Sequence, residues 1–280
     1  MGDVRRLLRD IGTAVDWRVG RLAGKPPFWM SRWERYRLKR APRLRRMTAP
    51  LLGKRIEITD PYWYLPTYDD IFANEIYKFT ASSATPLIID CGANIGLSVI
   101  YFKHLYPNAK IIAFEPDPGI VAVLERNIEK FALPNVELCR QAVWTSEVEM
   151  CFQPDGSVGG RLAKKGGAAP TVCVPGVRLR DFLAQPVDML KIDIEGAEHE
   201  VLLDCADALQ SVEHLFVEYH GRADEVQRLH DVLHILQNAG FRYHIREANP
   251  VAHPFLEAER SSFYDLQLNV FGFRTWGGTQ

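Results

Sequence analysis

The chain has 280 residues, of which 47% are apolar and 25% charged, a balance that is typical of a globular protein. This balance excludes a disordered chain, a collagen and a coiled-coil rod. The sequence has no run of about 18 apolar residues, so no membrane-spanning helix is predicted. The net charge of −1 hides an asymmetry, because residues 1–47 carry 14 Lys and Arg but only 4 Asp and Glu.

Residues 1–50 are predicted to form a basic N-terminal arm with two amphipathic helices, separated by Pro26-Pro27. In the second helix, aromatic rings interleave with basic side chains: Phe28, Trp29, Trp33, Tyr36, Arg32, Arg35, Arg37, Lys39 and Arg40. Three roles are open: packing against the acidic body or a second copy, contact with an anionic membrane, or binding of nucleic acid. Nucleic acid is the least favoured, because it would not require apolar helix faces. Residues 51–85 are predicted to be a lead-in of helices and loops.

From residue 86 onward, short apolar runs alternate with helical patterns, which predicts βα units on a mostly parallel sheet. Residues 147–178 predict a β-hairpin insertion around a glycine-rich loop. The last two predicted strands have no helical pattern between them and should form an antiparallel pair at one edge of a seven-stranded sheet. The predicted strands cover residues 87–90, 110–115, 136–140, 187–193, 214–219, 241–246 and 263–273. The fold class is therefore α/β, with a Rossmann-like domain over residues 86–280.

A glycine loop, Asp90-Cys-Gly-Ala-Asn-Ile-Gly96, joins the first of these strands to a helix. Ligands of open α/β sheets bind at this end of the strands, where glycine lets the backbone approach them. A dinucleotide loop would have glycine where this chain has Asn94 and Leu97. The pattern D-x-G-x-x-x-G is instead that of class I methyltransferases that use S-adenosylmethionine (SAM), and Asp90 could hold an ammonium group. The alternative is a purely structural turn.

Further segments fit a nucleoside ligand. Glu115 ends the second strand 23 residues after Gly92, where a carboxylate can accept hydrogen bonds from both ribose hydroxyls. Ala142 and Val143 follow the third strand and predict an apolar clamp or a backbone contact for adenine. Tyr77, just before the first strand, is predicted to close over the ligand. The alternative for Glu115 is a solvated acid in front of a turn.

Ionisable side chains gather at the ends of the fourth and fifth strands, in Lys191-Ile-Asp-Ile-Glu-Gly-Ala-Glu198 and Glu218-Tyr-His220. Adjacent parallel strands end at the same edge of a sheet, so Asp193, Glu218 and His220 should surround one crevice. Such a cluster can orient a hydroxyl, accept its proton or bind a divalent ion. Glu195 is a further candidate, although it and Glu198 could instead cap the following helix.

The five cysteines are odd in number and widely spaced, which favours neither a disulfide framework nor a zinc site and indicates a reducing compartment. The N-terminus lacks a continuous apolar segment and a small-residue cleavage site, so no secretory signal is predicted. We therefore expect a cytoplasmic protein, which the arm could also place on the inner face of a membrane.

Four strings of this sequence resemble the FkbM family of SAM-dependent methyltransferases: Ile89-Asp-Cys-Gly-Ala-Asn-Ile-Gly96, Phe114-Glu-Pro-Asp117, Lys191-Ile-Asp-Ile-Glu-Gly-Ala-Glu198 and Val217-Glu-Tyr-His220. The resemblance covers roughly residues 75–245 and leaves out the arm. It implies a class I Rossmann-like fold, SAM as cofactor, and methylation of sugar or polyketide-type hydroxyls in polysaccharide or natural-product biosynthesis.

The residues and the resemblance together predict a cofactor site made of Tyr77, Asp90, Gly92, Ala93, Asn94, Gly96, Glu115, Ala142 and Val143. The predicted catalytic residues are Asp193, Glu195, Glu218 and His220, with Arg161 as an outer candidate. The predicted ligands of a metal ion, if one binds, are Asp193, Glu218 and His220.

The leading hypothesis is a SAM-dependent O-methyltransferase that acts on a hydroxyl of a glycan, a glycolipid or a natural-product precursor. One alternative is a nucleotide-dependent oxidoreductase, which the missing glycines of the loop disfavour. The other is a binding or scaffold protein that retains the fold and acts through its basic arm, and the acidic cluster weighs against it.

Overall fold

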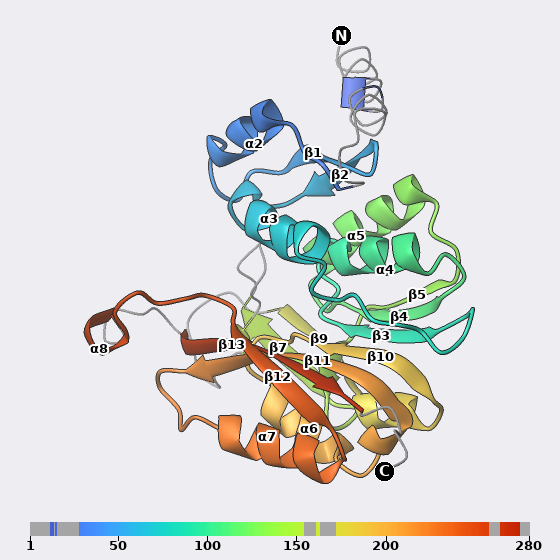
Figure 1. The fold of residues 1–280 in the computed structure, drawn as a ribbon, viewed down its shortest axis with the longest axis vertical. Helices are drawn as coiled ribbons and strands as arrows, with labels where there is room; N and C mark the ends of the chain where they lie inside the picture. The colour runs from blue at the N-terminus through green and yellow to red at the C-terminus, as the bar shows by residue number, and fades with distance from the viewer. Residues whose placement is uncertain are drawn as a thin grey trace, which may run out of the picture.

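The computed structural model describes residues 12, 13, 15, 28–153, 161–162, 172–257 and 264–274 (Figure 1). At the centre of these residues is a seven-stranded sheet with the order β12-β13-β11-β10-β3-β4-β5. Its strands run parallel except β13, which pairs antiparallel with both β11 and β12. The strands are β3 (Leu87–Cys91), β4 (Lys110–Phe114), β5 (Val136–Cys139), β10 (Val187–Ile192), β11 (Val212–Arg222), β12 (Arg242–Glu247) and β13 (Tyr264–Phe273). The predicted fold class, with its antiparallel edge pair, is confirmed.

Helices cover both faces of this sheet, because successive residues of a strand point to opposite sides. Ile88 of β3 belongs to one buried cluster, which it shares with helices α4 and α5, whereas its neighbour Ile89 belongs to another, shared with α6 and α7. Figure 1 shows α4 and α5 above the sheet and α6 and α7 below it. The helices are α4 (Leu97–Leu105), α5 (Pro118–Phe131), α6 (Glu198–Cys205) and α7 (Leu229–Asn238).

The predicted insertion forms a second, smaller sheet beside the main one. Its order is β6-β9-β7-β8, and β7 and β9 pair antiparallel, as expected for a hairpin over 147–178. The strands are β6 (Ala142–Trp144), β7 (Glu149–Gln153), β8 (Arg161–Leu162) and β9 (Val172–Arg178). A 3₁₀ turn, η2 (Leu179–Leu183), leads back to β10, and another, η3 (Leu209–Ser211), precedes β11. Most of the predicted glycine-rich loop lies outside the described residues.

Two cysteines of the insertion are joined, contrary to the expectation from their spacing. Cys151 of β7 lies directly opposite Cys173 of β9, with a Cα–Cα distance of 4.0 Å, and the two form a disulfide. Sequence spacing could not reveal this pair, because only the register of the two strands places the residues face to face. Cys91, Cys139 and Cys205 are free thiols.

The lead-in contains a β-hairpin that the sequence analysis missed. β1 (Met47–Leu51) pairs antiparallel with β2 (Lys54–Ile58), so the predicted boundary at residue 50 falls inside a strand. Arg55 of β2 is 1% exposed and donates to Glu34 Oε1 (2.8 Å) and to the Thr48 carbonyl (2.8 Å). This buried cation joins the end of the predicted arm to the lead-in; the division into three domains stays a prediction.

Further helices complete the lead-in and the carboxyl-terminal part. α3 (Pro61–Tyr68) continues into a π-helical turn, η1 (Asp69–Ala73), and a short helix, α8 (Pro254–Glu257), lies between β12 and β13. The second predicted helix of the arm is α2 (Arg32–Lys39), whereas the first falls largely outside the described residues. Within the residues that can be placed, none of the helices has both the length and the apolar character that a membrane crossing requires.

Candidate active site

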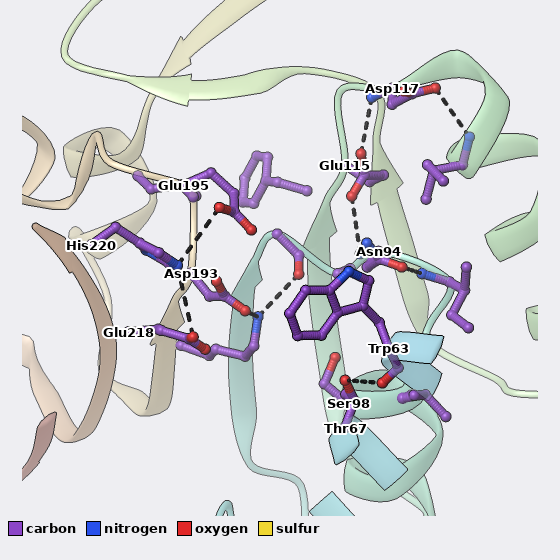
Figure 2. Close-up of a pocket in the computed structure, with 18 of the residues that line it drawn as sticks. Trp63, Thr67, Asn94, Ser98, Glu115, Asp117, Asp193, Glu195, Glu218 and His220 are labelled. Carbon is purple, nitrogen blue, oxygen red and sulfur yellow. Dashed lines mark hydrogen bonds and ion pairs between the residues drawn. The ribbon is translucent and has the colours of Figure 1, made fainter. Parts of the chain in front are cut away.

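A cavity of about 560 Å³ opens at the carboxyl ends of β3, β4, β10 and β11, where ligands of open α/β sheets bind. α3 lies on its other side and contributes Trp63 and Thr67 to the lining. Figure 2 shows two groups of side chains in it: Asn94, Glu115 and Asp117 at one end, and Asp193, Glu195, Glu218 and His220 at the other. We call these the cofactor end and the acidic end.

The glycine loop shapes the cofactor end. Gly92 has a φ of +86°, and a Cβ atom at this position would lie 1.9 Å from the Asp193 carbonyl oxygen. Only glycine fits here, because a side chain would collide with backbone and also strain the left-handed conformation. Gly96 is the N-cap residue of α4 and has a φ of +93°, and a Cβ atom there would approach the Leu124 side chain. Gly92, Ala93 and Asn94 line the cavity, whereas Gly96 does not.

Glu115 is the acid of the cofactor end that contacts the glycine loop. Its Oε2 accepts a hydrogen bond from the Asn94 backbone (3.0 Å) and its Oε1 accepts one from the Asp117 backbone (2.9 Å). Burial raises the pKa of this carboxyl to about 7, an effect that the two backbone donors partly offset. Since a carboxylate has about four lone-pair sites, the group retains acceptor capacity for the two hydroxyls of a ribose.

Asp90 is fully buried and does not line the cavity. Its Oδ1 lies 3.1 Å from Lys191 Nζ, and Ser98 Oγ donates to its Oδ2. Lys191 also donates to the Gly92 carbonyl (3.0 Å) and lies 3.4 Å from Asp193 Oδ2. Burial alone would lower the pKa of Lys191, but the two acids outweigh it and raise this pKa well above its usual range. In the structure Asp90 therefore holds the lysine under the loop, and its predicted contact with a ligand's ammonium group stays a prediction.

The other predicted cofactor residues line the cavity. Ala142 and Val143 lie on β6, where Val143 belongs to the same buried cluster as Phe114. Trp144 and Met150 add apolar surface beside them. These side chains offer an apolar slot for a flat base, without a carboxylate.

Tyr77 lines the cavity from a buried position. Its ring contacts those of Phe102 and Phe216, with centroid distances of 5.7 and 4.8 Å. Burial raises the pKa of its hydroxyl well above the ordinary value, so Tyr77 presents a neutral hydroxyl.

His220 is the centre of the acidic end. The distance from its Nε2 to Glu195 Oε2 is 3.6 Å and to Glu218 Oε1 is 3.7 Å. Dashed lines mark both ion pairs in Figure 2. Its Nδ1 lies 3.0 Å from Glu198 Oε1, and both side chains are almost fully buried. Burial alone lowers the pKa of His220, but Glu198, Glu195 and Glu218 together raise it well above its usual value. The three carboxyls thus favour the charged form of the imidazole, in which both nitrogens can donate.

Two carboxyls next to His220 have raised pKa values. Burial, reinforced by repulsion from Asp193, raises the pKa of Glu218 to about 8. Burial also raises the pKa of Glu195 to about 7, although His220 opposes it. General bases act best when their pKa lies near the working pH, so these carboxyls fit the role of proton acceptor better than His220 does.

A loop held by two side chains positions Glu195. Its backbone is in the left-handed region, with a φ of +60°, which is strained for a non-glycine residue. Glu198 accepts hydrogen bonds from the backbone of Ile194 (3.2 Å) and Gly196 (3.0 Å), so it holds the loop before α6; the N-cap of this helix is Ala197, without the side-chain cap predicted for Glu198. The Tyr264 hydroxyl donates to Glu195 Oε2 (3.0 Å).

Several residues of the cavity escaped the sequence analysis. Trp63 belongs to the aromatic run Tyr62-Trp63-Tyr64, and this run is the sequence pattern that could have predicted it as a site residue. Figure 2 shows the Trp63 ring pointing into the cavity. Tyr264 begins the last strand, and no motif marks it. Asn269 of β13 lines the cavity and is 9% exposed, and its Oδ1 has no hydrogen-bond partner among the described residues. The Arg161 side chain lies outside the described part of the chain.

The acidic end has a donor set that a metal ion could use. One atom from each of Asp193, Glu195 and His220 lies within 4.8 Å of the others. The predicted set contained Glu218 in place of Glu195. Carboxylate oxygens and an imidazole nitrogen suit several divalent cations, and Glu198 at Nδ1 would orient the ring. Metal binding itself stays a prediction.

Comparison with known proteins identifies the domain. The sequence profile described as "Methyltransferase FkbM domain" matches residues 90–243. "Methyltransferase sdnD" from Sordaria araneosa is 33% identical over 171 residues, which cover 48% of this chain and 66% of that protein. The chain thus spans just under two thirds of the length of this relative.

Two other relatives carry more specific names. "Hexuronic acid methyltransferase AglP" from Haloferax volcanii is 29% identical over 163 residues, 57% of this chain and 65% of that protein. "31-O-demethyl-FK506 methyltransferase FkbM" from Streptomyces tacrolimicus is 25% identical over 221 residues, which cover 66% of this chain and 84% of that protein. The crystal structure of methyltransferase FkbM from Methylobacillus flagellatus KT aligns with 74% of this chain and 50% of its own, at 15% identity and a TM-score of 0.48. Because the family profile covers more than half of its residues, this chain belongs to the FkbM methyltransferase family.

Proposed function

We propose that the chain is a SAM-dependent O-methyltransferase that acts on a hydroxyl of a sugar, a glycan or a natural-product precursor. The observation that carries the proposal is the single cavity joining Glu115 and the Gly92–Asn94 loop to the cluster around His220. Two relatives support it by name, one acting on a hexuronic acid and one at a 31-O position.

The residues of the cofactor end fit SAM. Gly92, Ala93 and Asn94 present backbone to the cavity, Glu115 keeps free acceptor capacity, and Val143 contributes to an apolar slot. The volume of the whole cavity, about 560 Å³, lies within the range of cofactor sites. When bound, SAM supplies a methyl group on a positively charged sulfur.

The acidic end would prepare the acceptor. Glu218 or Glu195 takes the proton from the attacking hydroxyl, while His220 and Lys191 keep these carboxylates and Asp193 in place. Asn269 offers its buried Oδ1 to a neighbouring hydroxyl of the acceptor. The enzyme otherwise contributes proximity and orientation, which can lower the barrier by roughly 7–11 kcal/mol in well-aligned systems.

Calorimetry with S-adenosylhomocysteine (SAH) tests the first half of the proposal. We expect binding of SAH and no comparable binding of NAD(H), and the absence of SAH binding at about 1 mM, an affinity of only about −4 kcal/mol, would contradict it. Transfer of a labelled methyl group from SAM to a panel of neutral hexosides, hexuronic acid glycosides and aminosugars tests the second half.

The chemical form of the product identifies the reacting group. A methyl ether on a hydroxyl resists mild alkali, whereas a methyl ester on a hexuronic acid carboxyl is released as methanol. We expect alkali-stable label on the hydroxylated sugars. Alkali-labile label alone would show a methyltransferase of carboxyl groups, and label only on amines would contradict O-methylation.

A divalent cation is the second candidate for activating the hydroxyl, favoured by the 4.8 Å grouping of Asp193, Glu195 and His220. Under this alternative, EDTA abolishes turnover and leaves SAH binding unchanged, and added Mg²⁺ or Mn²⁺ restores turnover. Full turnover in EDTA establishes a carboxyl group as the proton acceptor without a metal.

A further inference from the structure

A basic surface with exposed aromatic rings lies outside the family domain. Six cationic residues of α2 and the following loop have exposed side chains: Arg32, Lys39, Arg40, Arg43, Arg45 and Arg46. Among them, large apolar and aromatic side chains are also exposed: Trp33 (66%), Tyr36 (57%), Leu44 (56%) and Tyr62 (57%). We call these ten residues the basic–aromatic surface.

The opposite face of α2 is committed to the protein. Leu38 is buried in the main core, Arg35 pairs with Asp69 of η1, and Glu34 pairs with the buried Arg55. Arg37 also donates to Glu34 (2.6 Å) and to the Thr48 carbonyl (2.7 Å), so the helix is fixed with Arg32 and Lys39 facing solvent. Within the part of the chain that the structure describes, Arg43 is the member of the surface that forms an ion pair, with Asp60 at 3.3 Å.

Two of the exposed rings carry a guanidinium group on one face. Arg40 lies 5.1 Å from the centre of the Tyr36 ring, and Arg43 lies 4.8 Å from that of Tyr62. Rings with an apolar body and a polar tip, next to arginines that can reach phosphate groups, fit the headgroup layer of a bilayer. They fit single-stranded nucleic acid less well, because the covered ring faces are not free for base stacking, and Leu44 offers no stacking surface.

The surface is continuous with the mouth of the cavity. Arg43 belongs both to the surface and to the cavity lining. The Tyr62 ring contacts that of Trp63, with centroids 5.0 Å apart, and Trp63 points into the cavity. A partner bound to the surface would therefore lie beside the entrance to the active site.

We propose that the basic–aromatic surface docks on an anionic membrane and holds the cavity mouth at the headgroup layer, where a lipid-linked acceptor can enter. Charge complementarity favours an anionic membrane as the partner of this surface. Each basic residue near an anionic lipid surface strengthens membrane binding by about fivefold. The identity of the acceptor as lipid-linked rests on the proposed function, whereas the docking itself does not.

Sedimentation of the full chain with vesicles tests the docking. Vesicles of phosphatidylcholine with about 30% phosphatidylglycerol should carry the protein down at low salt, and vesicles of phosphatidylcholine alone should not. Since the arginines act through charge, the double variant Arg40→Glu, Arg45→Glu should lose at least about 25-fold in vesicle affinity. Trp33→Ser should weaken binding at high salt, where the rings contribute most.

A matched control reverses two exposed cations remote from the surface. Lys110 and Arg242 begin β4 and β12, at the edge of the sheet opposite to the cavity, so Lys110→Glu, Arg242→Glu should keep most of the vesicle affinity. Thermal unfolding and SAH binding, measured on every variant, report folding and the cofactor site separately from docking. A protein that binds vesicles but not SAH would refute the proposed function and leave the docking intact.

Four outcomes would overturn the docking proposal. In the first, the unaltered chain does not sediment with anionic vesicles, and in the second, both double variants lose equal vesicle affinity. In the third, the protein binds a 30-nucleotide DNA more tightly than the vesicles. In the fourth, the protein does not bind vesicles but forms a dimer, which the double variant Arg40→Glu, Arg45→Glu dissociates.

Discussion

At the cofactor end of the cavity, the Gly92–Asn94 loop presents backbone groups, and contacts with Glu115 and Lys191 hold this loop in shape. At the acidic end, side chains from the loop after β10, from β11 and from β13 meet around His220. A Cβ atom at Gly92 would displace the backbone of the whole loop, whereas the side-chain cluster around His220 can lose one member and keep its shape. Substitutions at the cofactor end should therefore change binding and stability together, and those at the acidic end should change turnover alone.

The largest effect is expected from Gly92→Ala. The new Cβ atom would lie 1.9 Å from the Asp193 carbonyl oxygen, so the loop or β10 must move, and SAH affinity should fall by more than about 100-fold. Gly196→Ala is the matched control, because its φ is also positive, but the nearest atom would lie 3.6 Å from the Cβ. Calorimetry with SAH and thermal unfolding of both variants measure the difference, and equal effects would contradict a collision at Gly92.

Glu218→Gln tests the acidic end. The amide cannot accept the hydroxyl proton, so turnover should fall by about 100-fold or more, while SAH affinity stays within about twofold. Glu137→Gln is the control, because this exposed acid of β5 lies outside the cavity lining. A parallel loss of SAH affinity in Glu218→Gln would show that the two ends are not separable.

Glu115→Ala tests the carboxylate that holds the Asn94 and Asp117 backbone at the cofactor end. It removes the acceptor for two backbone N–H groups and for the ribose hydroxyls, so SAH affinity should fall by roughly 10–100-fold. Calorimetry at pH 8, where the unaltered carboxyl is ionised, gives the full effect. Unchanged affinity would remove Glu115 from the cofactor site.

The pH dependence is the smallest expected effect. Because the pKa of Glu115 is about 7 in the folded protein, SAH affinity should rise by up to about tenfold between pH 6 and pH 8. The same raised pKa implies that the folded state binds a proton more tightly than the unfolded state, whose value is near 4.5. This contribution to the free energy of unfolding is complete below pH 4.5 and is lost as the pH rises through 7.

Denaturant titrations of the unaltered protein and of Glu115→Gln, across this pH range, isolate that contribution. The variant should lack this part of the pH dependence of both stability and SAH affinity. A variant with the same pH profile as the unaltered protein would assign the profile to other groups, such as Glu195.

The sheet and the cofactor loop could be predicted from sequence because their signals are local. Alternating apolar runs, the glycine loop and Glu115 all act through residues close in the chain. The meeting of Asp193, Glu218 and His220 followed from the rule that adjacent parallel strands end together.

What sequence could not predict depends on distant partners. The β1–β2 hairpin is fixed in part by the contact of Arg55 with Glu34, and the disulfide depends on the register of β7 and β9. The ion pair of Asp90 with Lys191, 101 positions later, is a further contact that the sequence did not predict. In each case the deciding group lies on another element, and only packing brings it there.

Some residues that line the cavity lie before or after the family domain in the sequence, and the family profile does not cover them. Residues 90–243 contain the glycine loop, Glu115 and the acidic cluster, but Trp63 precedes them, and Tyr264 and Asn269 follow. Under the proposed function, substitution of Trp63, Tyr264 and Asn269 would leave the glycine loop, Glu115 and the acidic cluster in place and change the surface that meets the acceptor. The preference for an acceptor can then change at the borders of the family domain, without a change in the residues proposed to bind the methyl donor.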